Sequence, residues 1–164
     1  MTAVPSGVSI APAAPTDVPR IHELMRGLAV YEKIEHEMVS SAADLERALF
    51  GKRPLAEALV GSLHGRAVGF ALFYPTYSTF SGKPGLWLED LFVDPAVRGA
   101  GVGRALLAAL AALAVERGCG SVQWEVLDWN APAIGFYDSL GAVPLAEWTT
   151  YKLAGEALAR LAGS

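Results

Sequence analysis

The chain has 164 residues, of which 52% are hydrophobic and 18% charged, and its formal net charge at pH 7 is −4. This composition predicts one globular domain over residues 1–164 with a core from about residue 8 to residue 161. The acidic balance argues against a protein that binds the backbone of nucleic acids, so no nucleic-acid partner is expected.

Three features of the sequence predict a cytoplasmic protein. The longest apolar run, Ala105–Val115, is too short to span a bilayer, so no membrane partner is expected. The N-terminal segment has neither the basic region nor the apolar stretch of a signal peptide. The single cysteine, Cys119, excludes a disulfide within the chain and is compatible with a reducing compartment.

The first third of the chain predicts one short strand and two helices. Val8–Ala11 is the strand, and Thr16 is the expected N-cap of a helix that runs to about Glu32 with apolar residues at helical spacing. Ser41 and Asp44 form a capping-box pattern that predicts a second helix over residues 42–50.

The middle of the chain predicts strands. The expected strands are Glu57–Leu63, Ala67–Tyr74 and Leu86–Val93. The first two are joined by a hairpin turn, and Pro75–Gly85 is expected to be a loop. The third strand is so apolar that we expect it to be central and covered on both faces. Its alternation predicts that Glu89 and Asp90 point to opposite faces.

The second half alternates helix and strand. The expected elements are a helix from about Gly101 to Arg117, a strand Ser121–Leu127, a helix Ala131–Leu140, a strand Leu145–Leu153 and a helix Gly155–Leu161. A strand, a helix and a further strand in succession favour a parallel pair of strands. The predicted fold class is therefore mixed α/β, a central mixed sheet flanked by helices.

A glycine-rich stretch, RGAGVGR at residues 98–104, lies between a predicted strand and a predicted helix. Glycines allow successive N–H groups to turn toward one point, and the helix N-terminus adds a positive end, so phosphate oxygens fit here. The pattern is neither a P-loop nor a dinucleotide fingerprint, because no Lys-Ser or Lys-Thr follows and the third glycine comes one residue early. It reads R-x-x-G-x-G, and a tight turn chosen for packing is the alternative.

R-x-x-G-x-G in this setting resembles the pyrophosphate-binding motif of the GCN5-related N-acetyltransferases (GNAT). Three stretches resemble the diamine and thialysine acetyltransferase branch: LEDLFVDPAVRGAGVG at 88–103, WNAPAIGFYDSLGA at 129–142 and LAVYEKIE at 28–35. The resemblance covers about residues 8–161. It implies a single GNAT-type domain whose parallel strands splay apart, acetyl-CoA as co-substrate, and a homodimer.

The resemblance also implies which residues bind acetyl-CoA. The glycine loop would hold the pyrophosphate, and the backbone of the third strand's end would lie along the pantetheine arm through a strand bulge. Asn130 and Tyr137 would contribute from the later helix. The whole expected set is Leu91, Phe92, Val93, Arg98, Gly99, Ala100, Gly101, Val102, Gly103, Arg104, Asn130 and Tyr137.

Two carboxylates and one tyrosine are the candidate reacting groups. A primary ammonium, with a pKa near ~10.4, must lose a proton before it attacks a thioester, and a carboxylate can hold the cation and take that proton. The resemblance implies that Glu89 is this base and an amine ligand and that Asp90 is a second substrate acid. It implies that Tyr137 protonates the leaving thiolate. A structural ion pair for the carboxylates and a core aromatic for Tyr137 are the alternatives.

Tyr31, Glu32 and Trp148 complete the expected amine site by resemblance, although a run such as 31–35 is more often a solvated helix end. The expected activity is acetyl transfer from acetyl-CoA to a primary amine of a small cationic substrate, a diamine, polyamine or thialysine-like compound, in a ternary complex. A protein N-terminal or lysine acetyltransferase and a non-catalytic CoA-binding regulatory module are the alternatives. The three histidines lack ligand spacing, so no metal is expected.

Overall fold

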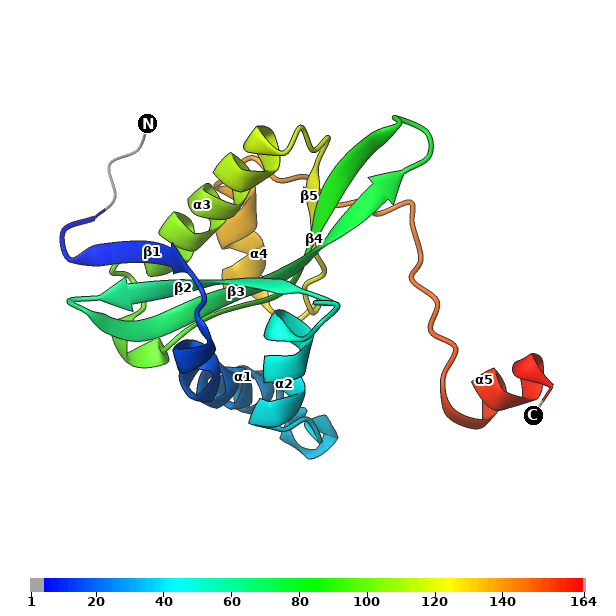
Figure 1. The fold of residues 1–164 in the computed structure, drawn as a ribbon. Coiled ribbons are helices and arrows are strands. Elements are labelled where there is room, and N and C mark those ends of the chain that lie inside the picture. Colours follow the sequence, from blue (N-terminus) through cyan, green and yellow to red (C-terminus); the bar gives the residue numbers. More distant parts are fainter. Residues whose placement is uncertain (1–4, 164) are drawn as a thin grey trace. The chain divides into compact units, whose positions relative to one another are not determined.

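The computed structural model describes residues 5–163, which divide into two compact units, residues 5–125 and 126–163. The first unit contains a five-stranded sheet and three α-helices (Figure 1). Its elements are β1 (Val8–Pro12), α1 (Val18–Glu32), α2 (Ala42–Phe50), β2 (Glu57–Leu63), β3 (Arg66–Ser78), β4 (Lys83–Val93), α3 (Val102–Glu116) and β5 (Val122–Gln123). The second unit contains α4 (Ala131–Asp138) and α5 (Gly155–Ala162).

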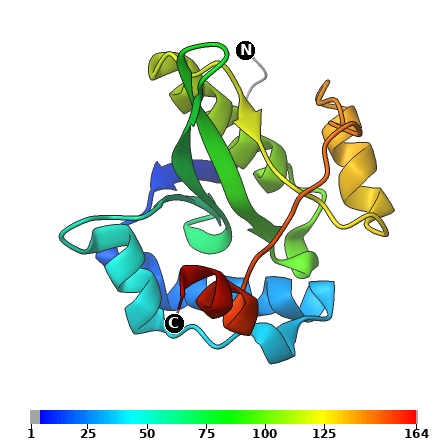
Figure 2. The same ribbon diagram turned by 90° about the vertical axis from the view of Figure 1, so that its right-hand side faces the viewer.

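The sheet has the order β1-β2-β3-β4-β5, antiparallel from β1 to β4 and parallel between β4 and β5. The parallel pair is short, because β5 meets β4 only at Leu86 and Trp87. From Leu88 to Val93 no other strand of the described chain pairs with β4 on that side, and Figure 2 shows the two strands seen from the side. The predicted mixed α/β fold with splayed parallel strands is confirmed.

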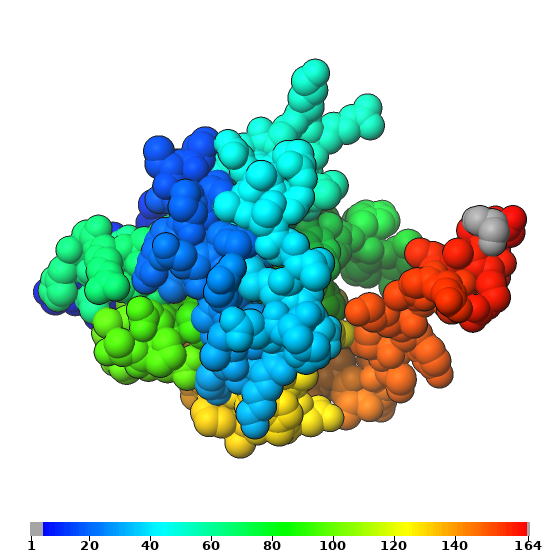
Figure 3. All heavy atoms as spheres, turned by 90° about the horizontal axis from the view of Figure 1, so that it is seen from below, coloured from blue at the N-terminus to red at the C-terminus, as the bar shows by residue number. Residues whose placement is uncertain are grey.

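Helices α1 and α2 cover one face of the sheet, and Figure 3 looks onto this face, where their atoms lie side by side. Their shared core joins both helices to β2, β3 and β4 through buried apolar side chains: Val18, Ile21, Leu24, Leu45, Leu49, Ala56, Ala58, Val60, Phe70, Leu72 and Phe92. Helix α3 covers the other face. The absence of a side chain at Gly61 lets α3 pack close to the sheet, since a Cβ there would lie only 2.7 Å from Val102 Cγ1.

Several predicted elements are confirmed. The Ser41–Asp44 capping box starts α2, with the Asp44 N–H donating to Ser41 Oγ at 3.2 Å and the Ser41 N–H donating to Asp44 Oδ2 at 2.8 Å. Strand β2 has the predicted bounds. The start of α1 differs by one residue, because a 3-10 turn over Pro15–Asp17 precedes it and Asp17, not Thr16, is the N-cap.

The predicted loop at Pro75–Gly85 is wrong. Strand β3 continues to Ser78 and β4 begins at Lys83, so the two strands form one long hairpin. Proline is tolerated in this hairpin because β2 reaches only as far as Phe73, which leaves the far side of β3 without a ladder that needs N–H donors. Proline content therefore misled the prediction at a place where the strand is an edge.

Two other predicted strands are shorter or absent. Strand β5 has two residues in place of Ser121–Leu127, and no strand forms over Leu145–Leu153 in the second unit as described. A strand requires a neighbour for its backbone groups, and the described part of this unit contains no other strand. Helix α4 ends at Asp138, two residues before the predicted end. Among residues 5–163, no helix has the combined length and apolar character of a membrane crossing.

Candidate active site

The glycine loop follows the end of β4 and leads into α3. Gly99 and Gly101 have φ values of 87° and 85°, in the region where a side chain is costly. Gly101 is the N-cap of α3 and makes no side-chain cap, so the N–H groups of Val102–Arg104 face outward from the first turn. These donors and the positive helix end suit the oxygens of a phosphate or pyrophosphate.

The last three residues of β4, Leu91–Val93, are the segment predicted to bind the pantetheine arm. This segment belongs to the part of β4 that splays from β5, so one edge of its backbone faces no strand of the described chain. The Phe92 side chain is buried in the α1–α2 core. An extended ligand could therefore pair with the backbone of this edge, as an added strand would, while Phe92 itself stays in the core.

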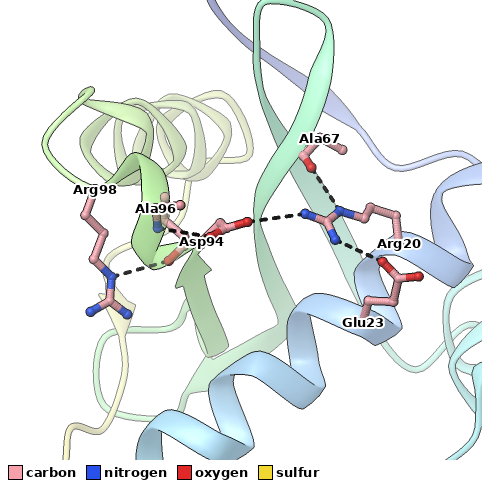
Figure 4. Close-up of polar contacts among 7 residues, drawn as sticks. Arg20, Glu23, Ala67, Asp94, Ala96 and Arg98 are labelled. Atoms are coloured by element: carbon pink, nitrogen blue, oxygen red, sulfur yellow. Dashed lines mark hydrogen bonds and ion pairs between the residues drawn. The ribbon is translucent and has the colours of Figure 1, made fainter.

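Arg20 joins α1 to the start of the loop (Figure 4). Its Nε donates to the Ala67 carbonyl at 3.0 Å and its Nη1 lies 2.9 Å from Glu23 Oε2. Its Nη2 is buried without a hydrogen bond in the described structure and lies 3.6 Å from Asp94 Oδ2. Asp94 in turn accepts the Ala96 N–H at 3.0 Å, so the ion pair connects α1 to the turn that precedes the glycines.

A β-bulge at Glu89 overturns the predicted arrangement of the two carboxylates. Leu72 of β3 pairs with Asp90 and Phe73 pairs with Leu88, so Glu89 is an extra residue in the ladder. The bulge was predicted within Leu91–Val93, and it lies instead at Glu89, two residues earlier. It interrupts the alternation, and Glu89 and Asp90 both reach the α1–α2 face.

Glu89 is held by two aromatic donors that the sequence analysis missed. Its Oε2 accepts hydrogen bonds from Tyr74 Oη and Trp87 Nε1, each at 3.0 Å. Burial, the bond to Glu89 and the charge of Glu125 raise the pKa of Tyr74 to about 12, so its hydroxyl remains a donor at neutral pH. The signal available in the sequence was the spacing of Trp87 and Glu89, two residues apart on one strand.

Asp90 lines a small cavity of about 170 Å³ with aliphatic walls. The cavity is bounded by Met25, Leu28, Ala29, Glu32, Ile34, Glu37, Met38 and Asp90. Burial, then the charges of Glu89 and Glu32, raise the pKa of Asp90 to about 6, and burial also raises the pKa of Glu32. A larger cavity, between α3 and strands β1 and β2, contains none of the predicted site residues.

The raised pKa of Asp90 predicts a pH-dependent stability difference for Asp90→Asn. Between the ordinary pKa of 3.8 and about 6, the folded chain holds this proton while the unfolded chain releases it, so wild-type stability falls as the pH rises. At neutral pH the free energy of unfolding of the variant should exceed that of wild type by on the order of 2 kcal/mol, and near pH 4 the two values should agree. Urea unfolding at both pH values measures this, and a less stable variant at neutral pH would contradict it.

The structure brings together four of the predicted amine-site residues. Glu32 and Asp90 share the cavity, Glu89 adjoins Asp90, and Tyr31 packs against the α1–α2 core next to Glu32. The described residues contain no group of three or more His, Cys, Asp or Glu side chains that could hold a metal ion.

The other predicted site residues lie in the second unit. Asn130 caps α4, as predicted, with its Oδ1 accepting the Ala133 N–H at 3.4 Å. The Tyr137 ring lies in α4 with its centroid 5.5 Å from that of Phe136. Trp148 is 76% exposed. Their roles in binding and catalysis stay predictions.

The splayed sheet and the glycine loop at a helix N-terminus suit a protein that binds a phosphate-bearing molecule. The chain belongs to the acetyltransferase (GNAT) family, whose model matches residues 21–142, and it is an acetyl-transferring enzyme of that family. Enzymes of this family use acetyl-CoA as co-substrate. The predicted family and enzyme class are confirmed.

Similar proteins include two named acetyltransferases and one solved structure. A thialysine N-epsilon-acetyltransferase of Bos taurus is 35% identical, with 95% of this chain and 98% of the relative covered. The L-ornithine N5-acetyltransferase NATA1 of Arabidopsis thaliana is 33% identical, with 89% and 84% covered. An integron cassette protein from the V. cholerae mobile metagenome superposes with a TM-score of 0.81 at 25% identity, over 96% of this chain and 99% of the other.

Proposed function

We propose that this protein acetylates a primary amine of a small cationic substrate, a diamine, polyamine or thialysine-like compound, in a ternary complex with acetyl-CoA. The observation that carries the proposal is the bulge that directs Glu89 and Asp90 to one face, beside an aliphatic cavity that also contains Glu32. Carboxylates there compensate a cation, and the walls contact methylene groups. Relatives named for thialysine and L-ornithine, which both carry a primary amine, agree with this class.

Acetyl-CoA supplies the thioester, and three parts of the chain would hold it. The N–H groups at the start of α3, with the loop from Arg98 to Arg104, would bind the pyrophosphate. The open backbone edge at Leu91–Val93 would accompany the pantetheine arm. Asn130 and Tyr137 would bind from the second unit, so the proposal requires both units to form one domain with its core at about residues 8–161.

The proposed chemistry assigns one role to each reacting side chain. The Glu89 carboxylate accepts a proton from the ammonium, directly or through water, and Asp90 holds the cation nearby. A backbone N–H at Leu91–Val93 polarises the carbonyl under attack. The Tyr137 hydroxyl gives its proton to the departing sulfur, and Trp148 and Tyr31 contact the amine. Holding both reactants together supplies much of the acceleration.

The remaining features of the proposal concern the setting of the enzyme. We propose a cytoplasmic homodimer without nucleic-acid or membrane partners, in which the acidic net charge of −4 favours cationic substrates. The homodimer rests on family resemblance, and sedimentation of the purified protein would test it.

The proposed activity is tested by acetyl-CoA-dependent thiol release with a panel of amines: spermidine, putrescine, thialysine, lysine, ornithine, aminoglycosides and short peptides. We expect one small aliphatic amine to exceed the peptides and aminoglycosides in kcat/KM by at least about tenfold. Preference for a peptide would favour a protein acetyltransferase. Calorimetric binding of acetyl-CoA without turnover of any amine would favour the non-catalytic module.

A further inference from the structure

The Arg98 side chain points back from the glycine loop toward β4 and α1. Figure 4 shows it reaching the end of β4, where its Nε donates to the Val93 carbonyl at 3.3 Å. Its guanidinium carbon lies 4.5 Å from the centroid of the Tyr31 ring and 5.7 Å from that of Phe92. Both distances are within the range of a cation–π interaction. The guanidinium of this loop residue is thus engaged with the amine side of the site.

Tyr31 lies in the last turn of α1. The helix ends at Glu32, and its C-cap, Lys33, has a φ of 63°, which is unusual for a residue with a side chain. Tyr31 packs against the α1–α2 core, and Arg98 lies over its ring. The next residue, Glu32, lines the cavity with Asp90. The position of the Tyr31 ring therefore bears on where the Glu32 carboxylate stands.

A second contact joins the same two parts of the chain. Arg20, near the start of α1, pairs with Asp94 at the start of the loop, with 3.6 Å between Nη2 and Oδ2. Arg20 thus anchors the N-terminal end of α1. The contact of Arg98 with Tyr31 anchors its C-terminal end, where Glu32 lines the cavity. The two arginines thus connect α1 at both ends to the segment that follows β4.

We propose that Arg98 is a positioning residue for the amine cavity: its guanidinium pins the Tyr31 ring and so holds Glu32 in place opposite Asp90. The side chain of this motif arginine then governs affinity for the amine more than affinity for acetyl-CoA. The proposal rests on the proposed amine acetylation and adds to it a residue from the loop expected to serve only the cofactor.

The test compares Arg98→Lys, Tyr31→Leu and the double variant with wild type. Lysine keeps the charge but loses the planar stack and the Nε fork, so charge and stacking are separated. The readouts are KM and kcat for the best amine of the panel, and the Kd of CoA by calorimetry. Tyr31→Phe keeps the ring face, so its KM for the amine should match that of wild type. Arg53→Lys, at an exposed arginine between α2 and β2, is the matched control for Arg98→Lys.

We expect Arg98→Lys to raise the KM for the amine about threefold to tenfold, with less than about twofold change in the Kd of CoA. The KM of the double variant for the amine should be no higher than that of the more impaired single variant, because the two single substitutions remove the same contact. Weaker CoA binding with an unchanged KM for the amine would overturn the proposal, as would additive effects. If wild type acetylates no amine, the proposed function itself fails, which is a separate result.

Discussion

Replacing Tyr137 with phenylalanine is expected to lower kcat by about a hundredfold or more. The departing CoA thiolate carries developing negative charge, and a phenol that donates a proton stabilises it only in the transition state. The ring of Tyr137 lies beside Phe136 in α4, and phenylalanine keeps that packing. The Kd of acetyl-CoA should therefore change little. Steady-state kinetics and calorimetry on the same preparation measure both quantities.

Tyr151→Phe is the matched control for this prediction. Tyr151 lies in the same unit and is 92% exposed, so loss of its hydroxyl should leave kcat unchanged. An unchanged kcat in Tyr137→Phe would remove Tyr137 as the acid. A higher Kd of acetyl-CoA with an unchanged kcat would instead make Tyr137 a binding residue.

Replacing Glu89 with glutamine is expected to lower kcat/KM for the amine about a hundredfold. The amide oxygen can still accept the hydrogen bonds from Tyr74 and Trp87, so the local structure persists while the negative charge and the proton acceptor are lost. Thiol release over about pH 6 to 9 would show whether raising the pH, which deprotonates free amine, restores part of the rate. Glu46→Gln, an exposed glutamate of α2, is the control.

The same variant has a second readout that needs no turnover. Glu89 contributes to the raised pKa values of Asp90 and Tyr74, so both should fall when its charge is removed. The Tyr74 pKa of about 12 should move toward its ordinary value of 10.0, which an ultraviolet titration of phenolate detects. Full activity in Glu89→Gln together with a large loss in Asp90→Asn would reassign the base to Asp90.

Local patterns in the sequence determined much of the fold. The Ser41–Asp44 capping box places the start of α2 because its hydrogen bonds lie within four residues. The apolar periodicity of α1 predicts which face is buried, since helical geometry repeats at a fixed spacing. The glycine loop is equally local, because a positive φ depends on the residue that adopts it.

The tertiary structure alone decided which site groups meet. The bulge at Glu89 exists because β3 and β4 pair in two registers around it, and pairing between strands is invisible in either strand alone. It converts two carboxylates predicted on opposite faces into neighbours beside the α1 cavity. The stack of Arg98 on Tyr31 likewise joins residues far apart in the chain. Sequence spacing named the chemical groups of the site, and long-range packing determined how they are combined.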